Sequence, residues 1–322
     1  MKLDFVSIGE VLVQLNALSP GPLRYVKYFE THVAGSEANM LVGLTKLGFK
    51  TGIISRVGDD EFGKLVTNFL RGEGVDVSKV KVDDTAPTGI YFIQRHFPIP
   101  GESTVFYYRH GSAASRLSPD DVDEEYVLGS RTVILTGITP ALSSTCYAAV
   151  EKMYRIAKSG GLDIVLDTNI RMKLWKDPSR ARNALTPFLQ AKIVFTNAKD
   201  LEILFPGLYQ RDAVSKILDN GCEIVVVKLG DKGAVAYDAK LNEYRVEAFK
   251  ISMVEDVIGA GDAFNAAFLA SIYKGLSIDQ ALLYASAAGA LVVTVRGDVE
   301  AQPSWRDLEA FLESFRGGVI LR

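Results

Sequence analysis

The stretch DVIGAGDAF, residues 256–264, places two glycines and an aspartate at the start of a long apolar run. Gly259 and Gly261 permit tight backbone conformations. If a helix begins here, its first amides have no acceptor within the helix, and the helix dipole favours negative charge at that end. The stretch therefore predicts an anion hole formed by Gly259, Ala260 and Gly261, with the amide of Asp262 as a further free donor.

Asp262 falls in the first turn of the same predicted helix. A carboxylate beside a bound phosphate makes chemical sense if it accepts a proton from an attacking hydroxyl, which is the arrangement used in phosphoryl transfer. The alternative is that Asp262 only caps the helix. The motif taken alone leaves both interpretations open.

Other glycine-containing stretches fit nucleotide-binding motifs poorly. GAGDAF has a phenylalanine where a dinucleotide-binding GxGxxG needs its third glycine, and it lies near the end of the chain. GLTKLGFKT (43–51) lacks the Gly-Lys pair of a P-loop. GDDEFGKL (58–65) has that pair, but Leu65 replaces the metal-binding hydroxyl and three acidic residues stand where phosphates would lie. We reject the P-loop interpretation for both.

Composition narrows the classes of function. The 322 residues are 48% hydrophobic and 23% charged, with a net charge of −3 and no basic block, so we expect no nucleic-acid partner. The two cysteines are far apart in sequence, and no CxxC is present. The N-terminal stretch is interrupted by Asp4 and Glu10, which is not typical of a signal peptide, and no apolar run reaches the roughly 20 residues of a membrane span. We expect a cytoplasmic protein without a membrane segment.

Short β-branched runs alternate with helix-like stretches from about residue 130, as in TVILTG (132–137), DIVLDTN (163–169), KIVFTN (192–197) and EIVVVKLG (223–230). This alternation predicts an α/β fold whose mostly parallel sheet is covered by helices on both faces. Segments of about 10–34 and 89–112 break the pattern, and GIYFIQRH followed by PIPG and STVFYYR is typical of a hairpin. We expect a small β-sheet lid there; the alternative is an edge extension without a lid role.

Two longer stretches resemble the signatures of the ribokinase-like sugar kinases, the phosphofructokinase-B (PfkB) family. The first runs from AGSEANMLVGLTKLG into RVGDDEFG, and the second is DVIGAGDAFNAAF. NAKD (197–200) and KLGDKGA (228–234) match two further motifs, and the likeness covers nearly the whole chain. The resemblance implies one ribokinase-like domain over residues 1–322, a three-layer α/β/α sandwich with a small β lid.

The resemblance also implies roles for individual residues. Asp262 is the expected catalytic base, and ATP with Mg²⁺ is the expected phosphoryl donor. Asn197 and Asp200 are expected near the metal, through water. The expected ATP-binding residues are Asn197, Lys228, Gly230, Gly233, Gly259 and Gly261. Two positions depart from the family pattern: Asp200 stands where many members have Glu, and Ile258 stands where many have Thr.

Two arginines near the expected sugar site point to an acidic substrate. Arg109 ends the predicted lid hairpin, and Arg171 follows DIVLDTNI. Arginine binds a carboxylate with a two-pronged, charge-assisted geometry, whereas neutral sugars need no fixed cation. The alternative for each is an ordinary surface arginine.

Within the family, the chain is most similar to the archaeal-type 2-keto-3-deoxygluconate kinases. PGPLRYVKYFETHVAGSEAN, TGIYFIQR, YYRHGSAASRLSP, LDTNIR and VTVRGD carry this similarity. It implies a sugar-acid site with Arg109 and Arg171 at the carboxylate end, Asp262 at the terminal hydroxyl and Asp298 on another hydroxyl. The expected substrate-binding residues are Gly35, Asn39, Tyr91, Tyr107, Arg109, Arg171 and Asp298.

The expected function is an ATP-dependent sugar-acid kinase that phosphorylates the terminal hydroxyl of 2-keto-3-deoxygluconate to give the 6-phosphate; 2-keto-3-deoxygalactonate is a further possible acceptor. Two alternatives stay open: a kinase of a neutral sugar or nucleoside, and a non-catalytic sugar or nucleotide sensor. The aromatic residues and open edges of the predicted hairpin also favour a homo-oligomer, at least a dimer, with the lids near the interface.

Overall fold

The computed structural model describes residues 2–315. Its strands are β1 (Leu3–Ile8), β2 (Leu12–Ala17), β3 (Phe29–Ala34), β4 (Thr51–Gly58), β5 (Asp76–Asp83), β6 (Ile90–Arg95), β7 (Ser103–Tyr108), β8 (Ser130–Thr136), β9 (Asp163–Asp167), β10 (Ile193–Asn197), β11 (Ile224–Lys228), β12 (Ala234–Asp238) and β13 (Glu243–Val246). Its α-helices are α1 (Ser36–Lys46), α2 (Glu61–Gly72), α3 (Glu124–Leu128), α4 (Ser144–Ser159), α5 (Met172–Trp175), α6 (Pro178–Leu185), α7 (Ala198–Leu204), α8 (Gln210–Leu218), α9 (Ala260–Tyr273), α10 (Ile278–Val292) and α11 (Trp305–Phe315).

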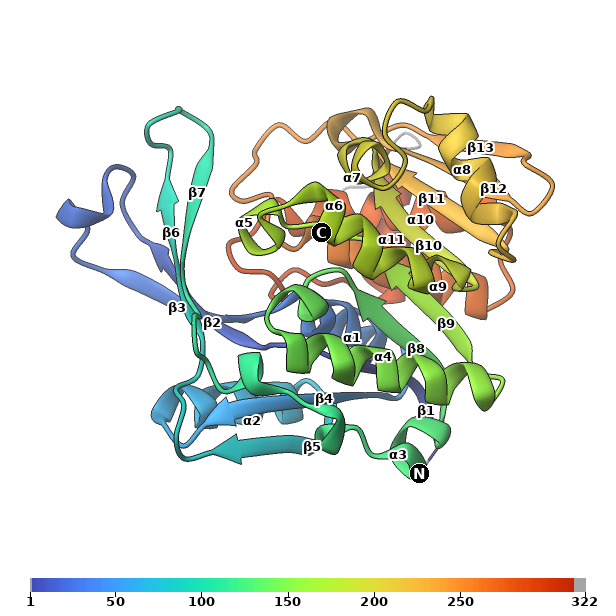
Figure 1. The fold of residues 1–322 in the computed structure, drawn as a ribbon. Helices are drawn as coiled ribbons and strands as arrows, with labels where there is room; N and C mark the ends of the chain where they lie inside the picture. The colour runs from blue at the N-terminus through green and yellow to red at the C-terminus, as the bar shows by residue number, and fades with distance from the viewer. Residues whose placement is uncertain (1, 316–322) are drawn as a thin grey trace.

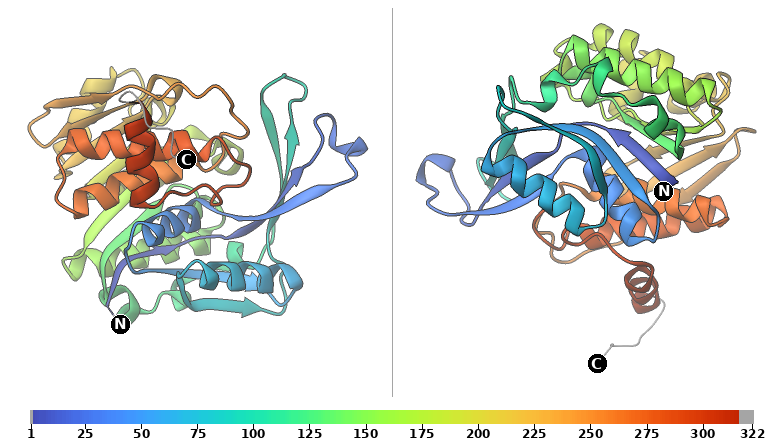
Figure 2. Two further views of the ribbon diagram at one scale, coloured as in Figure 1. Left: turned by 180° about the vertical axis from the view of Figure 1, so that it is seen from behind. Right: turned by 90° about the horizontal axis from the view of Figure 1, so that it is seen from below.

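The main sheet has nine strands in the order β13-β12-β11-β10-β9-β8-β1-β4-β5 (Figure 1). In this order, each neighbouring pair from β11 to β5 is parallel. At the other edge, β12 pairs antiparallel with β11, and β13 pairs antiparallel with β12. The central strands are apolar on both faces because helices cover both, as in other parallel sheets. One apolar core packs α1, α2, α9, α10 and α11 against the sheet, and a second packs α3, α4, α6, α7 and α8 against the opposite face (Figure 2). The predicted three-layer α/β/α fold is confirmed.

A second sheet of four strands, in the order β3-β2-β6-β7, projects from one end of the main sheet (Figures 1 and 2). It is built from the two segments that broke the α/β pattern. The hairpin of β6 and β7 is antiparallel, as the sequence predicted, and β2 joins it in parallel through β6. The inner face is a small apolar cluster of Leu12, Ala34, Tyr91 and Ile93, against which Ile258 packs. The lid sheet therefore touches the glycine-rich stretch directly.

The GDDEFGKL stretch forms the start of α2, and not a phosphate loop. The Asp60 side chain is the N-cap of this helix and accepts a hydrogen bond of 2.7 Å from the amide of Gly63. Its other oxygen accepts from the amide of Thr88 at 2.8 Å. The helix N-terminus is thus already occupied by a carboxylate, which explains the acidic residues in this stretch.

Polar side chains end three neighbouring parallel strands at one edge of the main sheet. Asp167 is the last residue of β9, Asn197 of β10 and Lys228 of β11. Asn197 lies directly opposite Lys228 in the strand register. Ligands of open α/β sheets bind at the carboxyl ends of the strands, so this edge is the expected place of the site. Among residues 2–315, none of the helices is long and apolar enough to cross a bilayer.

Candidate active site

The predicted anion hole lies at the N-terminus of α9. Gly259 is the N-cap and adopts a left-handed conformation with φ of +81°. A Cβ at this position would lie 2.7 Å from the carbonyl oxygen of Asp298, so glycine is required on both grounds. Within residues 2–315, no turn or loop hydrogen bond uses the amide of Ala260 or of Gly261 as donor, whereas the amide of Asp262 donates to the carbonyl of Gly259 at 3.1 Å. The expectation of a free amide at Asp262 was therefore wrong. The amide of Gly259 donates no turn or loop hydrogen bond in the described residues either, so the amides of Gly259, Ala260 and Gly261 remain for an anion.

The Asp262 carboxylate is held from both sides by residues of α1. Its Oδ1 accepts a hydrogen bond of 2.7 Å from the Ser36 hydroxyl, and its Oδ2 accepts one of 2.8 Å from the Asn39 amide. Burial raises the pKa of Asp262, while the bonds from Ser36 and Asn39 lower it. The side chain is oriented by other side chains and does not cap its own helix, as the alternative interpretation of the motif would require.

Asn39 links Asp262 to a second carboxylate. Its amide nitrogen also donates to Asp298 at 2.9 Å, and its side-chain oxygen accepts from the amide of Gly35 at 3.2 Å, which orients the amide group. Gln14 donates to the other oxygen of Asp298 at 2.7 Å. Burial, together with the charge of the neighbouring Asp262, raises the pKa of Asp298 to about 7, although the hydrogen bonds from Asn39 and Gln14 lower it. The two buried acids thus share one donor, the Asn39 amide, and the pKa of each is raised above its ordinary value.

The lid contributes aromatic residues above this pair of carboxylates. Tyr91 on β6 is buried, its hydroxyl accepts a hydrogen bond of 2.5 Å from Gln14 and lies 3.5 Å from Asp298, and burial raises its pKa. Tyr107 on β7 packs beside Tyr91 with ring centroids 5.5 Å apart. Gly35 has φ of +149°, and a Cβ there would lie 2.5 Å from the backbone oxygen of Glu10, so the chain passes too close for a side chain. Tyr91 is thus linked to Asp298 through Gln14, and the sugar site predicted from the sequence stays a prediction.

The two arginines differ in their surroundings. Arg109 is nearly buried and forms an ion pair with the buried Glu10, which also accepts a hydrogen bond of 2.5 Å from Ser112. Its Nε is buried without a hydrogen-bond partner in the described chain. Arg171 is exposed and forms no ion pair within residues 2–315. The ion pair of Glu10 with Arg109 was not predicted, because the two residues are far apart in the chain.

The cation of Lys228 lies next to the anion hole. Lys228 donates to the buried Asp167 at 2.9 Å and to Asn265 at 3.3 Å, and Asn265 donates to the same oxygen of Asp167 at 2.7 Å. The ammonium group is the nearest atom to a Cβ built on Gly261, at 3.7 Å. Asp167 and Asn265 were not among the predicted site residues, and only the position of Asp167 at a strand end signals its role. The arrangement holds one lysine beside the free amides of α9.

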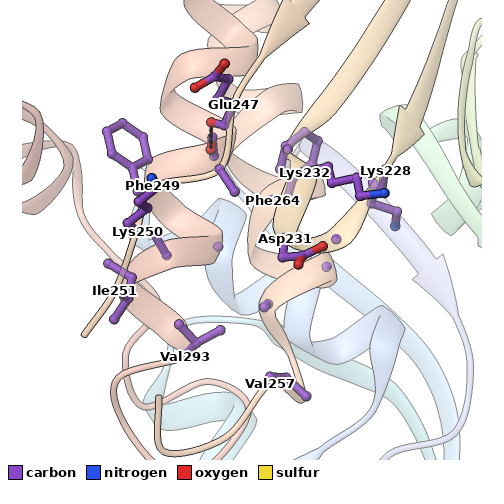
Figure 3. Close-up of a pocket in the computed structure, with 18 of the residues that line it drawn as sticks. Lys228, Asp231, Lys232, Glu247, Phe249, Lys250, Ile251, Val257, Phe264 and Val293 are labelled. Atoms are coloured by element: carbon purple, nitrogen blue, oxygen red, sulfur yellow. Dashed lines mark hydrogen bonds between the residues drawn. The ribbon is translucent and has the colours of Figure 1, made fainter. Parts of the chain in front are cut away.

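A cavity of about 1050 Å³ adjoins the anion hole, and Ala260 and Gly261 are among the residues that line it (Figure 3). Lys228, Gly230, Gly233, Ala260 and Gly261 line one end of it. The other part is mostly apolar, with Phe249, Ile251, Val257, Phe264 and Val293 around it. A polar end with free amides and a cation, joined to an apolar end, suits a phosphorylated ligand that carries a flat ring. A Cβ on Gly233 would meet the backbone oxygen of Val246 at 2.0 Å, so this turn also requires glycine.

The proposed metal residues are held by local bonds. The Asn197 side chain is the N-cap of α7 and accepts from the amides of Lys199 and Asp200. Asp200 is buried and accepts from the Thr168 hydroxyl at 2.6 Å and from the amide of Ile170 at 3.0 Å; burial raises its pKa. The part of the chain that the structure describes has no cluster of three metal-ligating side chains. These residues fit Mg²⁺ held chiefly by water and ligand phosphates, which is its usual coordination at nucleotide sites.

Comparisons with known proteins agree with this geometry. Residues 2–305 match the model of the pfkB family carbohydrate kinases. The chain is 48% identical over 314 residues to the 2-dehydro-3-deoxygluconokinase of Thermoproteus tenax, which covers 97% of this chain and 95% of that protein. It is 31% identical to a 5-dehydro-2-deoxygluconokinase of Clostridium perfringens, over 97% of this chain and 93% of the other. A putative ribokinase II from E. coli, solved in complex with ATP and Mg²⁺, superimposes with a TM-score of 0.89 at 30% identity, over 97% of this chain and 99% of that one.

Proposed function

The chain belongs to the pfkB family of carbohydrate kinases, and from that premise we propose that it transfers the γ-phosphate of ATP to the terminal hydroxyl of 2-keto-3-deoxygluconate. This compound is the 2-dehydro-3-deoxygluconate named for the relative from Thermoproteus tenax, and the identity of 48% over nearly the full length of both chains is the observation that carries the choice of substrate. The product is the 6-phosphate.

The chemistry of the transfer follows from the position of Asp262. The terminal hydroxyl of the sugar acid lies against this carboxylate, its oxygen attacks the γ-phosphorus, and its proton passes to Asp262 as ADP leaves. The free amides of Ala260 and Gly261, together with Lys228, stabilise the negative charge that develops on the phosphoryl oxygens. Bound Mg²⁺ would neutralise phosphate charge near Asn197 and Asp200.

The nucleotide is proposed to occupy the cavity beside the anion hole. Its phosphates would lie near Lys228, Gly230, Gly233 and Gly261, and its base would lie near Phe249 and Val293, all of which line the cavity. Asn197 and Gly259 do not line this cavity, and we propose that they lie next to the phosphates as the N-caps of α7 and α9. The related E. coli protein was solved in complex with ATP and Mg²⁺, which supports ATP as the nucleotide. The lid closes over the sugar on the opposite side of the anion hole and excludes water from the reaction.

The sugar acid is proposed to bind between the lid and α1. Asp298 and Asn39 bind its hydroxyls, and Gly35, Tyr91 and Tyr107 shape the space around it. Arg171 provides an uncompensated positive charge for the carboxylate, and Arg109 provides its unpartnered Nε. Because the Arg109 charge is offset by Glu10, we assign the larger share of carboxylate recognition to Arg171.

A second sugar acid is a competing acceptor. The relative from Clostridium perfringens acts, by its name, on 5-dehydro-2-deoxygluconate and matches this chain along 97% of its length. Both compounds carry a carboxylate and a terminal hydroxyl, so the same residues would hold them. We propose the 2-keto compound because the corresponding relative is more similar to this chain by 17 percentage points (48% against 31%).

The assembly is proposed to be a homo-oligomer with the lids near the interface. Tyr25, Tyr28, Phe106 and Tyr108 are exposed aromatic residues of the lid segments, and β3 and β7 are open edges of the lid sheet. Exposed aromatic residues beside open strand edges are typical of protein contacts. Because ATP is the phosphoryl donor, we also propose a cytoplasmic location.

The test of the proposed function is release of ADP in a coupled assay. The purified protein should release ADP when ATP, Mg²⁺ and 2-keto-3-deoxygluconate are all present, and much more slowly with gluconate, fructose, ribose or adenosine. Equal turnover of fructose would favour a neutral-sugar kinase. Binding of sugar acid and ATP without any ADP release would favour a sensor.

A further inference from the structure

The four consecutive residues Asp167 to Ile170, at the end of β9 and directly after it, contact different parts of the site. Asp167 accepts from Lys228 beside the anion hole. Thr168 and Ile170 both donate to Asp200, on the side where we place the metal. Asn169 donates to Ser36, and Arg171 follows at the sugar end. The segment 167–171 therefore joins the nucleotide side, the metal side and the sugar side of the site, and only the contact of Asn169 has no role in the proposed function so far.

The contact of Asn169 with Ser36 continues to Asp262. The Asn169 amide nitrogen lies 2.9 Å from the Ser36 hydroxyl oxygen, and this hydroxyl lies 2.7 Å from Oδ1 of Asp262. An ionised carboxylate only accepts hydrogen bonds, so the proton of Ser36 must point to Asp262. The lone pairs of Ser36 are then free to accept a hydrogen bond from the amide of Asn169. Asn169 therefore donates to Ser36, and Ser36 donates to Asp262.

The backbone supports this arrangement at both ends. Ser36 is the first residue of α1 and is nearly buried, so its hydroxyl has little access to water. Asn169 has φ of +30°, in the left-handed region that few residues other than glycine and asparagine adopt readily. An asparagine at this point combines a tolerated backbone conformation with two side-chain donors.

We propose that Ser36 and Asn169 are positioning residues of the kinase reaction, which act through the relay Asn169–Ser36–Asp262 to hold the catalytic carboxylate ionised. This inference rests on the proposed function, because it assigns Asp262 the role of base. Neither residue contacts the reacting atoms directly; Ser36 fixes Oδ1, and Asn169 fixes the direction of the Ser36 hydroxyl.

The relay matters because the surroundings of Asp262 oppose its charge. Burial and the nearby Asp167 raise the pKa of Asp262, and only the donors Ser36 and Asn39 and the cation Lys228 lower it. The charged and titratable groups that face Asp262 are Glu37 from α1, Asp167 from β9, Lys228 from β11 and Asp298 from the segment after α10. A base must be deprotonated to accept a proton, so a lost donor shifts activity to higher pH.

The first test measures kcat/KM for ATP-dependent phosphorylation of 2-keto-3-deoxygluconate against pH. In Ser36→Ala and in Asn169→Gly the acid limb should move to higher pH by about one unit, the size expected for one hydrogen bond to a charged carboxylate. Asn169→Gly is chosen because glycine tolerates the left-handed backbone. Activity at the alkaline plateau should stay within about threefold of the wild type, since the carboxylate is ionised there without help.

Two further variants make the test specific. Ser36→Thr keeps a hydroxyl and should restore the wild-type profile. Ser7→Ala removes a different buried hydroxyl, bonded to the backbone of Ile134 at 2.8 Å, and should leave the profile unchanged. A loss of kcat/KM that is equal at every pH in Ser36→Ala, or an unshifted acid limb, would overturn the relay and leave a structural role only.

A second test needs no turnover. The hydrogen bond from Ser36 lowers the pKa of Asp262 in the folded protein, and it therefore stabilises the fold most where Asp262 is ionised. Its removal should lower the stability by an amount that grows as pH rises. The Tm of Ser36→Ala should fall further below that of the wild type at pH 8 than at pH 5. In the Asp262→Asn background the same substitution should lower Tm equally at both pH values. If the difference in Tm caused by Ser36→Ala were independent of pH in both backgrounds, the relay would be contradicted. A wild-type protein without kinase activity would contradict the proposed function alone.

Discussion

Substitution of Arg171 should affect substrate recognition but not stability, whereas substitution of Arg109 should affect both. Arg171 is exposed and has no ion pair within the described residues, so Arg171→Leu should change stability by no more than about 0.5 kcal/mol. It should still lower kcat/KM for the sugar acid by roughly 10–200-fold, the equivalent of about 1.5–3 kcal/mol for one charged hydrogen-bond pair. ATP affinity should not change, because Arg171 is not among the residues that line the cavity proposed for the nucleotide.

Arg109→Leu should behave differently because Glu10 is buried. Removal of the arginine leaves the Glu10 carboxylate with only the hydrogen bond from Ser112. An uncompensated buried charge of this kind costs about 3–5 kcal/mol. A second change, Glu10→Gln, should restore much of the stability of Arg109→Leu without restoring kcat/KM, because the partner charge is gone and the unpartnered Nε is still missing.

The assay combines thermal melting with steady-state kinetics at one pH and salt concentration. Arg306→Leu is the matched control, since Arg306 is an exposed arginine on α11. Arg171→Lys should keep part of the charge but lose much of the effect, because an ammonium group cannot form the planar fork. The reasoning would be refuted if Arg171→Leu kept the wild-type kcat/KM, or if it lowered turnover of a neutral analogue, with the carboxylate reduced to an alcohol, by the same factor.

Three further predictions concern the acids and the lid. Asp262→Asn should lower kcat by roughly 10²–10⁴-fold with little change in ATP affinity, since the amides of α9 remain; loss of ATP binding with turnover preserved would instead indicate a structural cap. The pKa of Asp298 is raised from 3.8 to about 7 in the folded protein, so its contribution to stability is lost as pH rises from about 4 to about 7. Asp298→Asn should therefore gain stability over the wild type, by on the order of 2–3 kcal/mol more at pH 8 than at pH 5, while sugar-acid turnover falls; a difference in Tm that is independent of pH would show that Asp298 ionises normally. Light scattering at micromolar concentration should report a dimer or a larger assembly, and a monomer would refute the proposed contact through the lids.

Much of the fold could be predicted because local patterns determine it. The buried strands carry β-branched runs, and KIVFTN, predicted over 192–197, forms β10 at Ile193–Asn197. The hairpin of β6 and β7 follows from its aromatic strands and the intervening turn residues. The parallel pairing of β2 with β6 was not predicted, since it joins segments separated by more than 70 residues and leaves no local signal.

The chemistry of the glycine stretch was also visible in the sequence, because the glycines and Asp262 are adjacent. The contacts that pair or orient the charged groups of the site could not be predicted. Glu10 meets Arg109 across 99 residues, and Ser36 meets Asp262 across 226. Ile258, a departure from the family pattern, packs against the apolar face of the lid. Each of these pairs forms only when distant segments fold together, so a single sequence offers no spacing from which to infer them.

The central claim, a kinase specific for 2-keto-3-deoxygluconate, is tested most directly by a comparison of three acceptors under one set of conditions. Initial rates of ATP-dependent phosphorylation should be measured for 2-keto-3-deoxygluconate, 5-dehydro-2-deoxygluconate and fructose, with the phosphorylated carbon identified by NMR. We predict the highest kcat/KM for 2-keto-3-deoxygluconate, with the phosphate on its terminal carbon, and at least a tenfold preference over fructose, as expected for one charged contact. A higher kcat/KM for either other acceptor, or a product phosphorylated at another position, would contradict the claim.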